Sequence, residues 1–241
     1  MINSKTFYEN YWLKRNAQQR LHTREGMWIP ERIVKTIHMI KEHMGKDTVH
    51  ILDSACGEGT LGKLLKENYS ASTVLTGCDI SETALSLAAP FYDELHQINL
   101  EHDDLLEKMN NKRFDFAIAL EVLEHLFEPE KALHQLRSLL EDNGILIASF
   151  PNIAWYQNRL DLLRGDFPKD YLIHNAEHIH HFTLNSFHDL LENAGFELTD
   201  VLPCYKFPRW IRPKRLFYPI LKQFPSLFGY QIVTKARIKK N

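Results

Sequence analysis

The stretch Asp53-Ser54-Ala55-Cys56-Gly57-Glu58-Gly59 decides how this chain folds. It follows an apolar run that predicts a strand at 49–54, and it precedes an amphipathic segment that predicts a helix at 61–68. Its small residues let the backbone turn tightly and approach a ligand, while the first turn of the helix offers unpaired N–H groups. The stretch therefore predicts a ligand-binding turn, with a simple strand-to-helix turn as the alternative.

A second turn supports the ligand-binding interpretation. The next predicted strand, 72–78, ends in Thr76-Gly77-Cys78-Asp79, which places a carboxylate about 20 residues beyond the glycine-rich turn. In nucleotide-binding βαβ units, an acidic side chain at this distance hydrogen-bonds the hydroxyl groups of a ribose. The two turns together predict a site for a nucleoside-containing cofactor.

Short apolar runs alternate with amphipathic segments along most of the chain. This alternation is typical of βαβ units and predicts an α/β fold with a mostly parallel sheet and helices on both faces. Beyond the elements already named, we expect strands at 95–100, 114–120, 144–150, 197–204 and 230–239, and helices at 81–89, 129–140 and 184–193.

Three regions fall outside this alternation. Residues before about 47 predict two helices, at 8–19 and 30–43, which we expect to form an N-terminal helical cap at 1–47 rather than part of the core. The remaining residues, 48–241, form one predicted domain that contains the sheet. Two inserts interrupt it, at 151–182 and 205–228, and both are rich in aromatic residues.

Composition narrows the class of protein. A formal net charge of −2 argues against a general affinity for nucleic acid or acidic membranes. Three widely spaced cysteines argue against a disulfide framework and for a reducing compartment. The N-terminus has no apolar core of signal-peptide length, and no stretch approaches the roughly 20 apolar residues of a membrane span. We therefore expect a cytoplasmic protein, and the sequence does not indicate its oligomeric state.

The glycine pattern resembles the D-x-G-x-G-x-G motif of class I S-adenosylmethionine-dependent methyltransferases, with Ala55 in place of the first glycine. The resemblance runs from about residue 49 to 196, through Phe114-Asp115, Leu120–His125, Asn143-Gly144, Phe150-Pro151-Asn152 and Gly195-Phe196. It implies a Rossmann-like sheet with a final antiparallel strand and S-adenosylmethionine as the cofactor. The other interpretations are an NAD-dependent oxidoreductase, a non-catalytic scaffold that keeps the cofactor site, and another reaction of the sulfonium.

The same resemblance implies roles for particular positions in the cofactor site. Gly57 and Gly59 face the methionine moiety beside Ala55, and Asp53 orders the loop. Asp79 binds the ribose hydroxyls. The other implied positions are Ile80 over the adenine, Asn99 and Leu100 near the adenine amine (with Asp103 or Asp104 as alternatives), and the Leu120 carbonyl at the cofactor's amino group.

A group of acidic and histidine residues follows the predicted strand at 114–120. Glu121, Glu124 and His125 stand at i, i+3 and i+4, so a helix here would place all three on one face. This E-x-x-E-H pattern resembles the metal motif of small-RNA 3′-terminal 2′-O-methyltransferases and that of ubiquinone-biosynthesis O-methyltransferases. In the RNA enzymes a further histidine follows the fifth strand, and His178 matches it best here, with His174 second.

Two carboxylates and two imidazoles would suit Mg²⁺, Mn²⁺, Fe²⁺ or Zn²⁺, which makes Glu121, Glu124, His125 and His178 the candidate metal ligands. Methyl transfer to a hydroxyl is an in-line displacement, and a metal can orient the acceptor and lower its pKa. Without a metal, His125 or His178 would act as general base, so that the catalytic candidates are Glu121, His125 and His178. Acidic residues at a helix N-terminus without any metal are the structural alternative.

The insert at 205–228 carries six basic residues and no acidic one, interleaved with aromatic residues. As a lid it would contact an anionic acceptor or a membrane surface, while a packed subdomain with solvated charges is the alternative. The segment 151–166 and the end near Gly229 resemble methyltransferases of bacterial surface-polysaccharide clusters. This resemblance favours O-methylation of a sugar, a nucleotide-linked or phosphorylated sugar or a similar polar metabolite, ahead of a quinone-type phenol or RNA.

Overall fold

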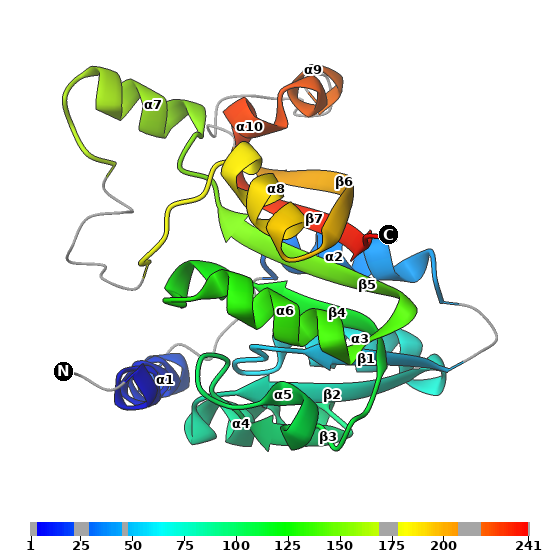
Figure 1. Cartoon of the computed structure of the whole chain (residues 1–241). Coiled ribbons are helices and arrows are strands. Elements are labelled where there is room, and N and C mark those ends of the chain that lie inside the picture. Colours follow the sequence, from blue (N-terminus) through cyan, green and yellow to red (C-terminus); the bar gives the residue numbers. More distant parts are fainter. Residues whose placement is uncertain (1–3, 22–28, 45–47, 169–177, 207–217, 241) are drawn as a thin grey trace.

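A computed structural model describes residues 4–21, 29–44, 48–168, 178–206 and 218–240. Within these residues lies a seven-stranded sheet with the order β3-β2-β1-β4-β5-β7-β6 (Figure 1). The strands are β1 (Val49–Asp53), β2 (Thr73–Asp79), β3 (Glu94–Gln97), β4 (Phe114–Leu120), β5 (Leu140–Pro151), β6 (Phe196–Tyr205) and β7 (Gly229–Ile238). β1 to β5 pair in parallel, and β7 runs antiparallel to both β5 and β6. The predicted Rossmann-like sheet with a final antiparallel strand is confirmed.

The described helices flank this sheet. They are α1 (Ser4–Leu21), α2 (Glu31–Lys41), α3 (Thr60–Tyr69), α4 (Glu82–Ala88), α5 (Leu105–Lys108), α6 (Pro129–Leu139), α7 (Tyr156–Leu163), α8 (Leu184–Asn193), α9 (Tyr218–Gln223) and α10 (Pro225–Phe228). Short 3-10 helices are η1 (Ser70–Ser72), η2 (Ala89–Phe91) and η3 (Leu123–His125). None of the helices in the described ranges is long and apolar enough to cross a membrane.

Each face of the sheet has its own apolar core. On one face, α6 and α8 bury apolar stripes against the strands, and the largest buried rings there are Phe150 and Phe187, which stack with centroids 4.2 Å apart. On the other face, α2 and α3 pack with Leu61 and Leu65 among the buried residues. The helical spacing of apolar residues that predicted these helices is the reason that each buries one face.

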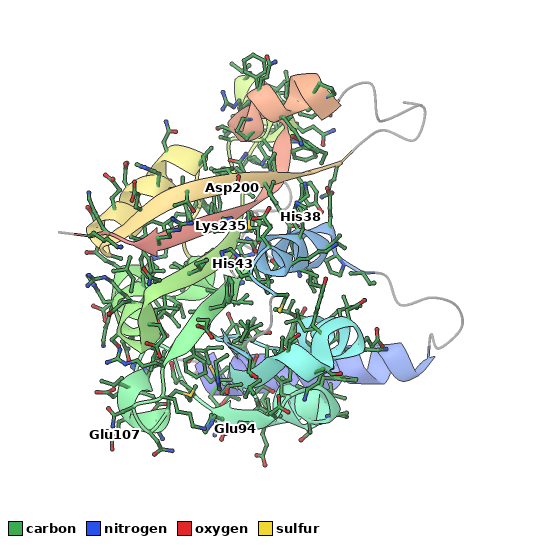
Figure 2. All side chains as sticks on the ribbon, turned by 90° about the vertical axis from the view of Figure 1, so that its right-hand side faces the viewer. His38, His43, Glu94, Glu107, Asp200 and Lys235 are labelled. Carbon is green, nitrogen blue, oxygen red and sulfur yellow. The ribbon has the colours of Figure 1, made fainter. Side chains whose placement is uncertain are left out.

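The two N-terminal helices differ in what they contact. α2 buries Ile33, Met39 and Ile40 in the core of the sheet, and the His43 ring that follows it meets Phe116 edge-on at 5.3 Å. Figure 2 shows α2, with His38 and His43, lying against the strands. α1 packs against α4 instead. The expectation that both helices lie outside the core is therefore wrong for α2, because its apolar stripe faces the sheet, and only α1 has the position of a cap.

Several boundaries follow from local chemistry. Pro129 occupies the first position of α6, where its missing N–H costs no hydrogen bond. Gly195, with φ of +80°, follows α8 and allows the left-handed turn into β6. β3 is shorter than predicted and ends at Gln97, so Asn99 and Leu100 lie in the loop beyond it. The sequence did not predict α7, since the insert at 151–182 lacks a clear helical period.

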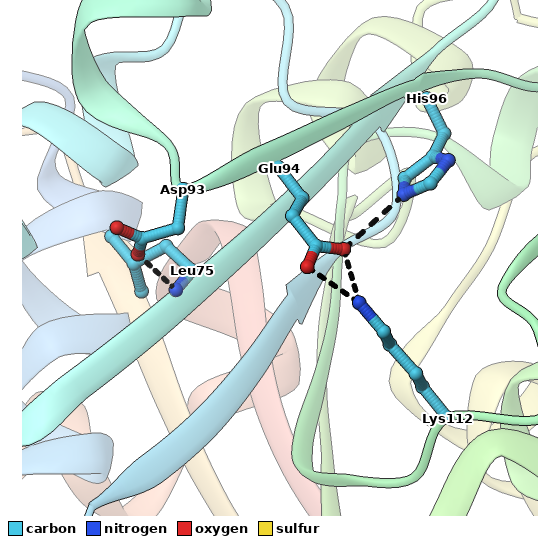
Figure 3. A network of polar contacts seen from close by, with 5 residues as sticks. All are labelled: Leu75, Asp93, Glu94, His96 and Lys112. Atoms are coloured by element: carbon cyan, nitrogen blue, oxygen red, sulfur yellow. Dashed lines mark hydrogen bonds and ion pairs between the residues drawn. The ribbon is translucent and has the colours of Figure 1, made fainter.

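β3 is an edge strand, and charged residues protect it. Figure 3 shows the Glu94 carboxylate between the Lys112 ammonium and the His96 ring, whose Nε2 lies 3.6 Å from the carboxylate. Beside it, Asp93 accepts a hydrogen bond from the backbone N–H of Leu75 at 2.8 Å. Charged side chains on an edge disfavour pairing with another chain.

The register brings several strand ends to one edge of the sheet. Asp53 lies beside Gly77 and Ile118, Leu120 beside Ser149, and Pro151 beside Gln231. Because β7 runs antiparallel, it begins where β5 ends. This edge is where open α/β sheets bind their ligands.

Candidate functional site

The glycine-rich turn joins β1 to α3 at this edge. Gly57 and Gly59 have φ values of +53° and +84°, a region that L side chains rarely adopt. A Cβ on Gly59 would come within 2.9 Å of the Ala88 Cα, so the turn also packs closely on α4. Ala55 lies in the same turn and is not among the residues with positive φ, which is why an alanine fits in place of a glycine.

The Asp79 carboxylate lies against this turn. It accepts hydrogen bonds from the backbone N–H of Gly57 and of Ser81, each at 3.0 Å. Asp79 is buried, and burial raises the pKa of its carboxyl against the opposing effect of these bonds. Ile80 follows, half-buried, with its carbonyl bound by the Gln97 side chain. The structure thus places Asp79 and Ile80 beside the turn, and their cofactor contacts remain predictions.

Asp53 lies at the base of the turn and bonds to a residue that the sequence did not single out. The Tyr92 hydroxyl donates to the Asp53 carboxylate at 2.6 Å and accepts from the Gly62 N–H at 3.2 Å. Burial raises the pKa of Asp53 to about 6. Asp53 and Tyr92 therefore fix the turn to the first residues of α3.

The loop after β3 also approaches Asp79. The Ile98 N–H donates to the Asp79 carbonyl at 3.1 Å, which draws Asn99 and Leu100 toward the same edge. The Asp103 carboxylate accepts from the Asn99 N–H at 2.7 Å, and the Asp104 carboxylate caps the start of α5. Both alternatives to Asn99 thus have local structural partners.

Leu120 ends β4, and the chain turns sharply at Glu121, whose φ is +52°. The Glu121 carboxylate accepts from Ser149 Oγ at 2.9 Å and from Gln231 Nε2 at 2.6 Å. Burial raises the pKa of Glu121, while the nearby Arg32 guanidinium opposes the rise. These bonds direct the carboxylate toward β5 and β7.

Glu124, His125 and His178 form a separate group, in which one ligand atom from each residue lies within 4.8 Å of the others. Glu124 is only 1% exposed, and neither of its carboxylate oxygens has a hydrogen-bond partner. The ring centroids of His125 and His178 are 4.8 Å apart. Burial, with His125 and His181 as further causes, lowers the pKa of His178 to about 4, so this imidazole is neutral at neutral pH. Burial and then the charge of Glu121 raise the pKa of Glu124 well above its usual value.

The expected four-residue group is therefore reduced to three. The residues after β4 form no α-helix but the short η3, which begins at Leu123, and Glu121 precedes it in a left-handed conformation. The i, i+3, i+4 face assumed from the spacing does not exist. His178 is brought in because the N–H groups of Ile179 and His180 both donate to the Glu124 carbonyl, at 2.8 and 3.0 Å. The second choice, His174, lies outside the described residues.

Helix α1 extends over the edge and brings in residues taken from the sequence as packing residues. The Glu9 carboxylate accepts from the Ser81 hydroxyl at 2.8 Å and from the N–H groups of Glu82 and Thr83 at 3.0 and 3.1 Å. A Cβ on Gly57 would come within 2.9 Å of the Trp12 ring. Tyr8 meets the His125 ring edge-on, with centroids 6.1 Å apart. No local pattern could have revealed these contacts, which join residues far apart in the chain.

The far end of the edge is aromatic and basic. Lys206 Nζ lies 4.5 Å from the centroid of the Tyr230 ring and 5.5 Å from that of Trp155. Trp155 is buried, and its indole N–H has no hydrogen-bond partner. Of the six basic residues noted in the insert at 205–228, Lys206 and Lys222 lie among the described residues, and Arg209, Arg212, Lys214 and Arg215 lie outside them.

Comparisons with known proteins agree with this geometry. A family model for a methyltransferase domain matches residues 14–201. A ubiquinone biosynthesis O-methyltransferase of Coxiella burnetii strain Dugway is 24% identical over 204 residues, which cover 76% of this chain and 82% of that protein. In proteins of the same name from other Coxiella burnetii strains, the match is 27% identical over 140 residues and covers 58% of their length.

Solved structures show the same fold. Magnesium protoporphyrin IX methyltransferase from Synechocystis PCC 6803, with bound SAH, has a TM-score of 0.65 at 17% identity, and the match covers 98% of this chain and all of that one. The 1,6-didemethyltoxoflavin-N1-methyltransferase of Burkholderia thailandensis, with S-adenosylhomocysteine and its acceptor bound, has a TM-score of 0.59 at 16% identity, covering 98% of this chain and 87% of that one. Since the family model spans most of the chain and the sheet carries the matching cofactor turn, the chain belongs to the methyltransferase-domain family and is an S-adenosylmethionine-dependent methyltransferase.

Proposed function

We propose that this methyltransferase methylates a hydroxyl group and that Glu124, His125 and His178 hold a divalent cation at the acceptor. The observation that carries the proposal is the pair of Glu124 oxygens, buried and without hydrogen-bond donors. Leaving a buried carboxylate unpaired is costly, and a cation bound by it and by two imidazoles would remove that cost. Mg²⁺, Mn²⁺, Fe²⁺ and Zn²⁺ all accept this donor set.

The reaction explains why such a group would be useful. Transfer from the sulfonium needs the acceptor oxygen in line and deprotonated. A bound divalent cation supplies a Lewis acid that lowers the pKa of the hydroxyl. His178 stays neutral because of its burial, so it can ligate or accept the proton. That second role makes it the general base of a metal-free reaction, with His125 as the other candidate.

In this proposal Glu121 does not ligate the cation. Its carboxylate holds the Gln231 side chain in place at 2.6 Å, at the edge where the acceptor binds. For the cofactor we propose the contacts implied by the motif: Asp79 to the ribose, Ile80 over the adenine, and the turn against the methionine. Asp53 orders that turn through Tyr92.

For the acceptor we propose a sugar or related polar metabolite that carries a negative charge, as in surface-polysaccharide synthesis. The basic Lys206 beside Trp155 and Tyr230 supports an anionic, ring-shaped ligand at this edge. A quinone-type phenol is the second candidate, supported by the curated relative at 24% identity. The free, buried cysteines support the proposed cytoplasmic location.

The test is transfer from methyl-labelled S-adenosylmethionine to a panel of nucleotide sugars, sugar phosphates and catechols, with chelator and with each divalent ion. We expect a labelled methyl ether, loss of turnover in chelator and recovery with one or more of the ions. Full turnover in excess chelator would refute the metal, and a methyl group on nitrogen or carbon would refute O-methylation. Cofactor binding without turnover of any acceptor would favour the scaffold alternative.

A further inference from the structure

Helix α7 and the residues after it carry exposed apolar side chains. Leu163 is 83% exposed and Leu162 50%, and Leu160 and Phe167 are exposed to 44% and 48%. Of the eight residues of α7, only Asn158 is buried. A helix that packs so little on its own domain does not gain stability from these leucines, which points to an external partner.

This surface continues onto the second insert. The Tyr156 ring of α7 lies 6.1 Å from that of Phe228 in α10, and Phe228 lies 6.5 Å from Phe224. Phe224 is itself 53% exposed. Figure 1 shows α7, α9 and α10 together at one end of the molecule, beyond the end of β5. We call the exposed side chains of Leu160, Leu162, Leu163, Phe167 and Phe224 the apolar surface.

The charges around the apolar surface are mainly basic. Arg159 and Arg164 of α7 and Lys222 of α9 are exposed. The insert at 205–228 has six basic residues and no acidic one, although the whole chain has a formal charge of −2. Of the acidic residues in the first insert, Asp161 is paired with Arg164 at 3.6 Å.

We propose that the apolar surface and its basic rim bind the face of an anionic lipid bilayer. Apolar side chains flanked by Lys and Arg are the combination that lies in the interface of such a bilayer, with the basic groups at the anionic headgroups. A second copy of this chain is the poorer fit, because a two-fold contact places the same basic rim against itself. This inference does not depend on the acceptor or on the metal.

The test is sedimentation with vesicles of phosphatidylcholine alone and of phosphatidylcholine mixed with phosphatidylglycerol. We expect binding to the mixed vesicles that weakens as salt rises, and little binding to phosphatidylcholine alone. The double variant Leu160→Ser/Leu163→Ser should weaken this binding about tenfold or more, since both side chains would leave the apolar phase. Val34→Ser is the matched control, because Val34 is 54% exposed on α2 and should bind as the parent does.

Retained S-adenosylhomocysteine binding and an unchanged melting temperature would show that the double variant is folded. Three results would overturn the proposal: no sedimentation of the parent with mixed vesicles, equal binding by the double variant, or equal binding to both kinds of vesicle. Light scattering supplies the fourth. A dimer that the double variant converts to monomers would assign the surface to a second copy instead.

Discussion

Replacing Glu124 with Gln separates a metal ligand from a buried structural carboxyl. A cation that binds only the folded protein stabilises it by about 2.7 kcal/mol at a hundred times its dissociation constant. For a domain of this size, each kcal/mol raises the melting temperature by about 2–4 °C, so the parent protein should gain roughly 5–11 °C. The variant lacks one of three ligands, and an affinity loss of about 100-fold would leave about 0.4 kcal/mol, or roughly 1–2 °C.

The same variant should behave differently in chelator. Glu124 makes no hydrogen bond through its side chain, and its burial raises the pKa of the carboxyl. A neutral amide of the same shape therefore breaks nothing, and Glu124→Gln should melt no lower than the parent without metal.

Thermal melting in chelator and with each divalent ion measures both effects. Glu130→Gln is the control, since Glu130 is exposed on the adjacent helix α6 and should keep the full metal-dependent rise. The reasoning fails if no ion raises the melting temperature of the parent, or if Glu124→Gln shows the same rise. A variant that is several degrees less stable in chelator would show that the carboxylate has a structural partner.

Two further predictions concern the cofactor site. Asp79→Ala should weaken S-adenosylhomocysteine binding by about 1.5–3 kcal/mol, or roughly 10- to 150-fold, through the lost charge-assisted contact with the ribose; unchanged affinity in calorimetry would refute the ribose assignment. The folded-state pKa of Asp53 is raised from 3.8 to about 6, so between these pH values the folded protein holds a proton that the unfolded chain has lost. Its free energy of unfolding should therefore fall as pH rises through this window, by about 3 kcal/mol, and Asp53→Asn should remove that fall. Denaturant unfolding of the cofactor-free proteins at several pH values measures it, and identical profiles for parent and variant would contradict the burial argument.

Features that depend on local backbone chemistry could be predicted from the sequence. The turn after β1 needs positive φ at Gly57 and Gly59, and the acidic residue after β2 needs only to follow that strand. Both are properties of a few adjacent residues, so their spacing was enough. The same holds for the order of strands and helices, since the apolar period of each segment is read without its neighbours.

What only the tertiary structure decided is the grouping of side chains at the edge of the sheet. The sequence placed Glu121 with Glu124 and His125 by assuming a helix, but the left-handed backbone at Glu121 turns its carboxylate to Ser149 and Gln231. Those partners lie on β5 and β7, and their nearness follows from strand order and register alone.

Long-range contacts decided the rest. His178 reaches Glu124 because two backbone N–H groups of its segment bind one carbonyl, and Glu9 reaches the start of α4 from the opposite end of the sequence. α2 belongs to the core because its apolar stripe meets the sheet, a partner that no window of sequence contains. The sequence by itself determined the elements, the cofactor turn and the family. The tertiary structure decided which charged side chains meet, because contacts between distant segments depend on how the whole sheet is assembled.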